Sequence, residues 1–168
     1  MDDLAHATWL RILTGDDRGI RQREDTITET ILLDLDVRQP DLIVHRFNQN
    51  EENAVGADWE WFIGSDRAGW FCLRIQAKRV DQGQYKQLGH PGHGTDDYQY
   101  DTLIRSCSES TAATGVKSFP YYVFFNGFAK WPSDATWSGC PRGFPLGECK
   151  HASLYDFGCS AAPADLVR

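Results

Sequence analysis

The 168-residue sequence has no apolar run long enough to cross a membrane. Its first residues, Met1-Asp2-Asp3, are acidic, so it also lacks the basic and then apolar pattern of a secretion signal. We therefore expect a cytoplasmic protein without a membrane partner. Internal repeats and low-complexity tracts are missing as well. The 41% of hydrophobic and 24% of charged residues are ordinary for a globular protein, which predicts a single domain over residues 1–168.

Positive charge is scarce in this chain, because 17 Lys and Arg face 24 Asp and Glu for a net charge of −7. This balance argues against a protein that coats nucleic acid non-specifically. The deficit is confined to residues 1–60, which hold 14 acidic and 6 basic residues, whereas residues 61–168 hold 10 acidic and 11 basic. The overall charge therefore permits a nuclease but does not by itself indicate one.

The five cysteines are an odd number in a chain without a secretion signal, which favours reduced thiols or a metal site over disulfides. Three thiols and one imidazole form a set that permits a structural Zn²⁺ site: Cys140, Cys149, His151 and Cys159. The set lacks a tight Cys-x-x-Cys pair, and buried free cysteines are the alternative. These residues belong to a segment rich in Cys, Gly and Pro, which we predict to be an irregular C-terminal extension over residues 127–168.

Hydrophobic periodicity predicts the remaining elements of the chain. In chain order these are a helix at 3–13, a helix from Thr26 to just before Pro40, strands at 42–47, 57–63 and 70–79, a helix at 98–109 and a buried strand at 120–126. A polar turn is expected between the first two strands, at 48–53. The predicted class is α/β, with a core of helix, three strands, helix and strand over about residues 26–126.

Polar side chains gather on two neighbouring predicted strands. Because strand side chains alternate between two faces, Asp58 and Glu60 share one face of the first strand, and Gln76 and Lys78 share one face of the next. Carboxylates and an amide carbonyl suit a hard divalent cation, and a lysine beside such an ion can orient water or stabilise charge on a phosphate. The alternative to a metal site is that these residues form the solvent-exposed face of ordinary amphipathic strands, although acidic residues are poor strand formers.

These residues carry a family resemblance. Asp58, followed on the next strand by Gln76-Ala77-Lys78, resembles the PD-(D/E)XK nuclease superfamily in its Mrr-like variant, where glutamine replaces the acidic residue before the lysine. The longer string, GADWEW at 56–61 with QAKR at 76–79, is similar to a family of uncharacterised bacterial proteins with this signature. The superfamily resemblance covers about residues 26–126. It implies a restriction endonuclease-like core with the aspartate on the second strand and the lysine on the third.

The resemblance implies a metal-dependent endonuclease that hydrolyses phosphodiester bonds, first of all in DNA, with a role in defence against foreign DNA. One Mg²⁺ or Mn²⁺ would be held by Asp58, the Gln76 side-chain oxygen and the Ala77 carbonyl, while Lys78 orients the attacking water. Glutamine is neutral, so a further acidic residue is required.

Two residues are candidates for this missing acid. Glu60 shares the strand face of Asp58. Glu29 lies on the first core helix, where several nuclease families of the superfamily place a metal-facing glutamate. Glu29 also fits a capping box with Thr26, which is its structural alternative.

Basic residues around the predicted site are candidates for contacts with the nucleic-acid backbone. Arg74, Arg79 and Lys86 would give affinity that depends on salt and largely ignores sequence. At the start of the helix at 98–109, Gln99 and Asp101 occupy positions where some families of the superfamily place a polar residue that touches the site. Solvation of a helix start is the alternative there.

Other functions stay open at this stage. The chain can be a catalytically inactive member of the fold, acting as a protein-binding or regulatory module or as an acidic nucleic-acid mimic, and the neutral Gln76 favours this alternative. RNA can replace DNA as the substrate, because the phosphate chemistry is shared. The resemblance also leaves open a homodimer, which many nucleases of this class form to cut duplexes, and an activating or recognition partner protein.

Overall fold

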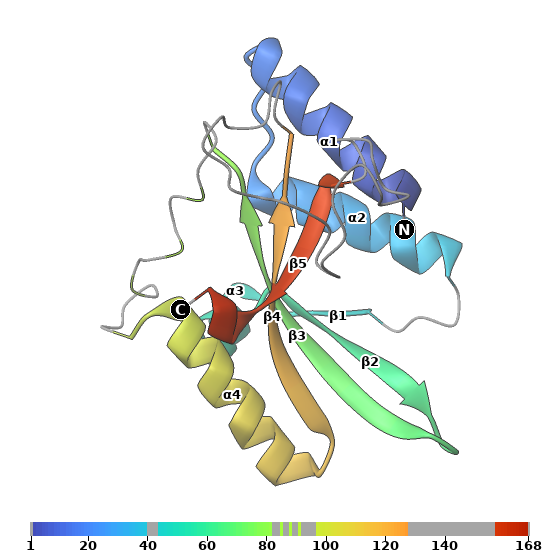
Figure 1. Cartoon of the computed structure of the whole chain (residues 1–168), viewed down its shortest axis with the longest axis vertical. Helices are drawn as coiled ribbons and strands as arrows, with labels where there is room; N and C mark the ends of the chain where they lie inside the picture. Colours follow the sequence, from blue (N-terminus) through green and yellow to red (C-terminus); the bar gives the residue numbers. More distant parts are fainter. Residues whose placement is uncertain are drawn as a thin grey trace.

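The computed structural model describes residues 2–39, 44–81, 85, 88, 91, 97–127 and 157–167. These residues form a sheet with helices on both faces (Figure 1). The elements are α1 (Asp2–Asp17), α2 (Glu24–Arg38), β1 (Val44–Arg46), α3 (Gln49–Val55), β2 (Trp59–Ser65), β3 (Gly69–Arg79), α4 (Gln99–Thr114), β4 (Lys117–Phe125), β5 (Cys159–Pro163) and the 3₁₀ helix η3 (Ala164–Leu166). The α/β class is thereby confirmed.

The sheet is mixed and has five strands in the order β1-β2-β3-β4-β5. All neighbours are antiparallel except β3 and β4, which are parallel and therefore need a long connection, here one that contains α4. The predicted order of helix, three strands, helix and strand is present, and helix α3 and strand β5 are added to it. The prediction of an irregular segment over 127–168 is wrong at residues 159–163, because β5 pairs with β4 and closes that side of the sheet.

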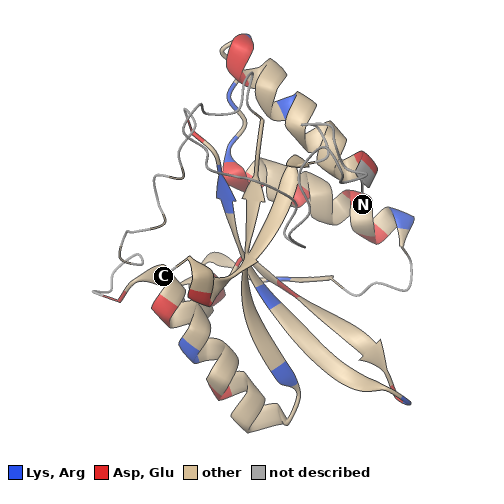
Figure 2. Ribbon diagram, in the orientation of Figure 1, with Lys and Arg blue, Asp and Glu red and all other residues tan. Residues whose placement is uncertain are grey.

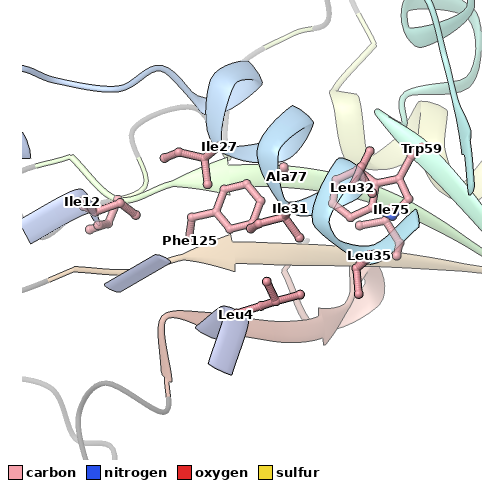
Figure 3. Close-up of a cluster of buried hydrophobic side chains, with 11 residues drawn as sticks. Leu4, Ile12, Ile27, Ile31, Leu32, Leu35, Trp59, Ile75, Ala77 and Phe125 are labelled. Atoms are coloured by element: carbon pink, nitrogen blue, oxygen red, sulfur yellow. The ribbon is translucent and has the colours of Figure 1, made fainter. Parts of the chain in front are cut away.

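Each face of the sheet has its own hydrophobic core. Helices α1 and α2 cover one face with the cluster shown in Figure 3, which contains Leu4, Ile12, Ile27, Ile31, Leu32, Leu35, Trp59, Ile75, Ala77, Val80 and Phe125. Helix α4 covers the other face, where Leu103 and Cys107 pack against Tyr122. Strand β3 therefore sends Ile75 and Ala77 into the first core, whereas Gln76 between them faces α4.

The predicted polar turn at 48–53 is instead the short helix α3. Asn48 caps it by accepting hydrogen bonds from the backbone N–H groups of Asn50 and Glu51, and the Glu51 carboxylate accepts from the Asn48 N–H. This reciprocal capping box satisfies N–H groups that have no partner inside the helix. Helical periodicity missed α3 because none of its residues is buried.

Gly56 ends α3 and allows it to pack closely against α4. Its φ of 72° is left-handed, a conformation that favours glycine. A Cβ atom at this position would lie 2.8 Å from the backbone nitrogen of Leu103 and 3.0 Å from the carbonyl oxygen of Gln99. The glycine therefore fixes the distance between the segment that leads into β2 and the first turns of α4.

Helix α2 begins two residues before the predicted start at Thr26. Its N-cap is Arg23, whose side chain makes no capping hydrogen bond, and Glu24 and Asp25 occupy the first turn. Thr26 is therefore not the N-cap of this helix, and the capping box that was the structural alternative for Glu29 is not formed.

Several predictions fall outside the part of the chain that the structure describes. These concern Lys86, Cys140, Cys149 and His151, so the zinc set stays a prediction. Its fourth member, Cys159, lies on β5 and is partly buried. Among the described residues, no helix combines the length and the apolar character that a membrane span requires.

Candidate active site at the end of strand β3

Asp58 is held between two strands. It lies one residue before β2, where its backbone N–H donates to the carbonyl oxygen of Ile75 at 2.8 Å and its carbonyl oxygen accepts from Phe47 N–H at 3.0 Å. Its carboxylate accepts from the Ala77 backbone N–H at 2.5 Å and from Gln76 Nε2 at 2.8 and 3.0 Å. The structure therefore brings the predicted pair Asp58 and Gln76 into direct contact.

The Asp58 carboxylate is poorly solvated. This burial is the largest influence on the group and raises its pKa from 3.8 to about 7. The hydrogen bond from Ala77 and the charge of Lys78 act in the opposite direction, while the acidic side chains of Glu24 and Glu52 raise the pKa further. The site thus holds a carboxylate whose ionised form is not fully balanced by its protein neighbours.

Lys78 reaches the same site from the end of β3. Its side chain is only 5% exposed, and its Nζ atom lies 3.6 Å from Glu24 Oε1. The second carboxylate oxygen of Glu24 accepts from the Arg79 backbone N–H at 2.7 Å. Burial raises the pKa of Glu24, and the Lys78 charge lowers it. Figure 2 shows the acidic start of α2 beside the basic end of β3.

Gln76 links Asp58 to helix α4. Its Oε1 atom accepts from Gln99 Nε2 at 2.6 Å, while its own Nε2 donates to Asp58. Gln76 is buried, so these contacts replace water around its amide group. Of the two polar residues considered at the start of this helix, Gln99 therefore contacts the site, and Asp101 lies in the first turn.

The two candidates for the additional acid have other partners. Glu29 is exposed and pairs with Arg46 at 2.6 Å. It lies five residues after Glu24, which places it on a different side of the helix. Glu60 is buried and pairs with Arg74 at 3.0 Å and with His45 at 3.2 Å. The structure thus corrects both expectations: Glu24 is the acid beside Lys78.

The assignment of Arg74 and Arg79 to a surface that contacts phosphates is also corrected. The Arg74 side chain is 13% exposed and donates to Glu60 and to the carbonyl oxygen of Ser106. The Arg79 side chain is 4% exposed and donates to Asp16 and to its neighbour's carbonyl oxygen. Both guanidinium groups hold elements of the fold together.

Sequence reasoning missed two acidic residues near the site, Glu24 and Glu52. Glu24 could have been found from the pair Glu24-Asp25 directly before the apolar period of α2, since acids favour the first turn of a helix. Glu52 lies on α3, which was not predicted. Its pKa is raised by burial, and it interacts electrostatically with Lys78 and Glu24.

The donor set fits a hard divalent cation by its chemistry. Asp58 and Glu24 offer carboxylate oxygens, Ala77 a carbonyl oxygen and Gln76 an amide oxygen, all of which Mg²⁺ accepts. Gln76 would have to turn its amide over, because Nε2 now faces Asp58. Among the described residues, no three His, Cys, Asp or Glu side chains are close enough to form a metal site on their own.

Fold and site together define an α/β protein with a mixed five-stranded sheet. At the end of its central strand, the half-buried Asp58 carboxylate lies beside the buried side chains of Gln76 and Lys78. The chain belongs to the family described as "Family of unknown function (DUF6615)", whose model matches residues 1–168. A search of the curated proteins gave no match to the chain.

Proposed function

We propose that this protein is a metal-dependent nuclease that hydrolyses phosphodiester bonds, first of all in DNA. The observation that carries the proposal is a pair of contacts at the end of β3: Gln76 donates to Asp58, and Lys78 pairs with Glu24. Burial raises the pKa of both carboxyl groups, and such perturbed groups concentrate at functional sites. The resemblance to PD-(D/E)XK nucleases, in the variant with glutamine before the lysine, supports the same reading.

Each side chain has a role in this proposal. Asp58 and Glu24 hold one Mg²⁺ or Mn²⁺, together with the oxygens of Gln76 and Ala77. When bound, the ion supplies stabilisation of the charge that develops on the phosphate. Lys78 has three N–H donors and uses only part of them on Glu24, so its ammonium group can orient the water that attacks the phosphorus atom.

A second candidate function is a binding module whose site no longer catalyses. The specific observation in its favour is the Gln76 amide, which donates to both oxygens of Asp58 and so gives the carboxylate hydrogen-bond partners without a metal. A protein-binding or regulatory role, or mimicry of nucleic acid by the acidic chain, would then follow. The two functions differ in whether Lys78 and a metal are needed.

Cleavage assays separate these functions. Plasmid DNA, single-stranded DNA and RNA are incubated with the protein in Mg²⁺, Mn²⁺ or chelator. The variants are Asp58→Asn, Lys78→Met and Glu24→Gln, with Glu29→Gln as the matched control on the same helix. We expect metal-dependent cutting that the first three substitutions reduce by at least about 100-fold and the control leaves intact.

Two outcomes would overturn the nuclease proposal. One is intact nucleic acid under every metal condition with correctly folded wild-type protein. The other is cutting that survives Lys78→Met and Asp58→Asn, since the activity would then come from elsewhere or from a contaminant. Equal losses in Glu24→Gln and Glu29→Gln would instead contradict the assignment of Glu24 as the acid of the site.

A further inference from the structure

A cavity of about 480 Å³ adjoins the proposed site and has no role in the chemistry described so far. Its walls are the segment before α2, the end of β3 and residues of the following loop, and they include Arg21, Gln22, Arg23 and Tyr85. Lys78 and Glu24 also line it, so the cavity opens directly onto the proposed catalytic groups. Its volume falls in the range of small-ligand pockets, roughly 300–1,000 Å³.

Two exposed arginines line this cavity. Arg21 pairs with Asp81 at 3.2 Å with its side chain 56% exposed, and Arg23 lies 4.0 Å from Asp25 with its side chain 85% exposed. A guanidinium has five N–H donors, so both retain donors beyond these single contacts. Unlike the buried Arg74, they can contact a phosphate without breaking up the fold.

Two further polar atoms at the cavity wall are buried without a hydrogen-bond partner among the described residues, Gln22 Oε1 and Arg79 Nε. Buried polar groups are normally satisfied, so such atoms require an explanation. Gln22 is half-buried and can turn its amide toward the cavity. Its oxygen needs a donor, which a phosphate lacks and a nucleobase or sugar hydroxyl provides.

We infer that this cavity binds one nucleotide of the substrate strand, next to the phosphate that is cut. Arg21 and Arg23 contact the phosphate of that nucleotide, and Gln22 contacts a donor on its base or sugar. The inference rests on the proposed nuclease function for the identity of the ligand. The cavity, its cations and its unpaired polar atoms are features of the fold itself.

Binding is tested separately from cleavage. The fluorescence anisotropy of a labelled 12-nucleotide single strand is followed with chelator and with Ca²⁺, and gels verify that the strand stays intact. The double variant Arg21→Gln/Arg23→Gln is compared with Arg67→Gln/Arg105→Gln, which removes the same charge from exposed positions outside the cavity lining. The cavity variant should bind about tenfold more weakly than the control, and its plot of log K against log salt should be flatter by about one.

A second comparison addresses the base and sugar contact. Gln22→Met should weaken binding of the normal strand severalfold and leave binding of a strand without bases unchanged if the donor is on the base. If the donor is the 2′-hydroxyl of the sugar, the loss should appear with RNA and not with DNA. Equal effects of Gln22→Met on every strand would overturn the Gln22 contact.

The result is distinguishable from failure of the nuclease proposal. If the wild-type protein never cuts, and the cavity variant but not the control variant binds the strand more weakly, the nucleotide site stands and the nuclease does not. If wild-type protein cuts while the cavity and control variants bind equally well, the nuclease stands and this inference is overturned. Absence of strand binding by the wild type under both conditions also overturns it.

Discussion

Replacing Asp58 with Asn should remove a pH-dependent cost that the folded protein carries near neutral pH. Burial raises the pKa of this carboxyl group from 3.8 to about 7. Between those two pH values, the folded chain holds a proton that the unfolded chain has already released. The free energy of unfolding therefore falls as pH rises through this window and levels off above pH 7.

The size of the effect follows from the shift. Each pH unit inside the window costs up to about 1.4 kcal/mol, so the full span costs at most about 4 kcal/mol of stability. Asparagine is neutral at every pH and lacks this slope. Its side-chain oxygen can still accept from the Ala77 N–H. The second oxygen is replaced by an NH₂ group, so one acceptor for Gln76 Nε2 is lost, which costs about 1 kcal/mol. The two stabilities should cross at about pH 4.5, so Asp58→Asn should be the less stable protein at pH 4 and the more stable one at pH 8.

Urea unfolding at pH 4, 5, 6, 7 and 8 measures this crossing. The difference between wild type and variant isolates Asp58, because every other titrating group is common to both proteins. Glu24 also has a raised pKa, so Glu24→Gln serves as a comparison with an effect in the same direction. Parallel stability curves for wild type and Asp58→Asn across the whole range would refute the reasoning.

Three further predictions concern the metal and the elements that support the site. Added Mg²⁺ at pH 8 should raise the Tm of the wild type and leave Asp58→Asn unchanged; equal shifts would contradict binding at this site. Gly56→Ala should cost several kcal/mol by urea unfolding, whereas Gly115→Ala, with the same φ of 72° but open space around it, should cost only about 1 kcal/mol. Asn48→Ala should cost about 1 kcal/mol by loss of the α3 cap, and no loss would contradict the capping box.

The core of the candidate site was predictable because it depends on local rules. Alternation along two strands joined by a short turn put Asp58 and Gln76 on strands that the structure pairs directly, and Lys78 two residues further on. The same rule put Trp59 on the opposite face, where it packs in the core under α2. A hairpin needs no knowledge of distant contacts, so period and turn residues suffice.

The remaining parts depend on information that the local pattern lacks. Helix α3 has no buried residue and hence no apolar period to detect. Strand β5 is five residues long and is stabilised by its pairing with β4, more than thirty residues earlier in the chain. Glu24 reaches Lys78 because the end of β3 passes the start of α2. Only the tertiary arrangement shows which of several acids on that helix contacts the site.

The cost of this arrangement is an argument for a function. Burial raises the pKa of Asp58, of Glu24 and of the nearby Glu52, and all three interact electrostatically with the same cation, Lys78. A scaffold selected only for stability would replace such groups with apolar or neutral residues, since buried charges without full compensation destabilise a fold. Departures from that expectation concentrate where a ligand supplies the missing charge. A divalent cation at Asp58 and Glu24 would do so, and the Mg²⁺ dependence of the Tm tests this point without any assumption about the substrate.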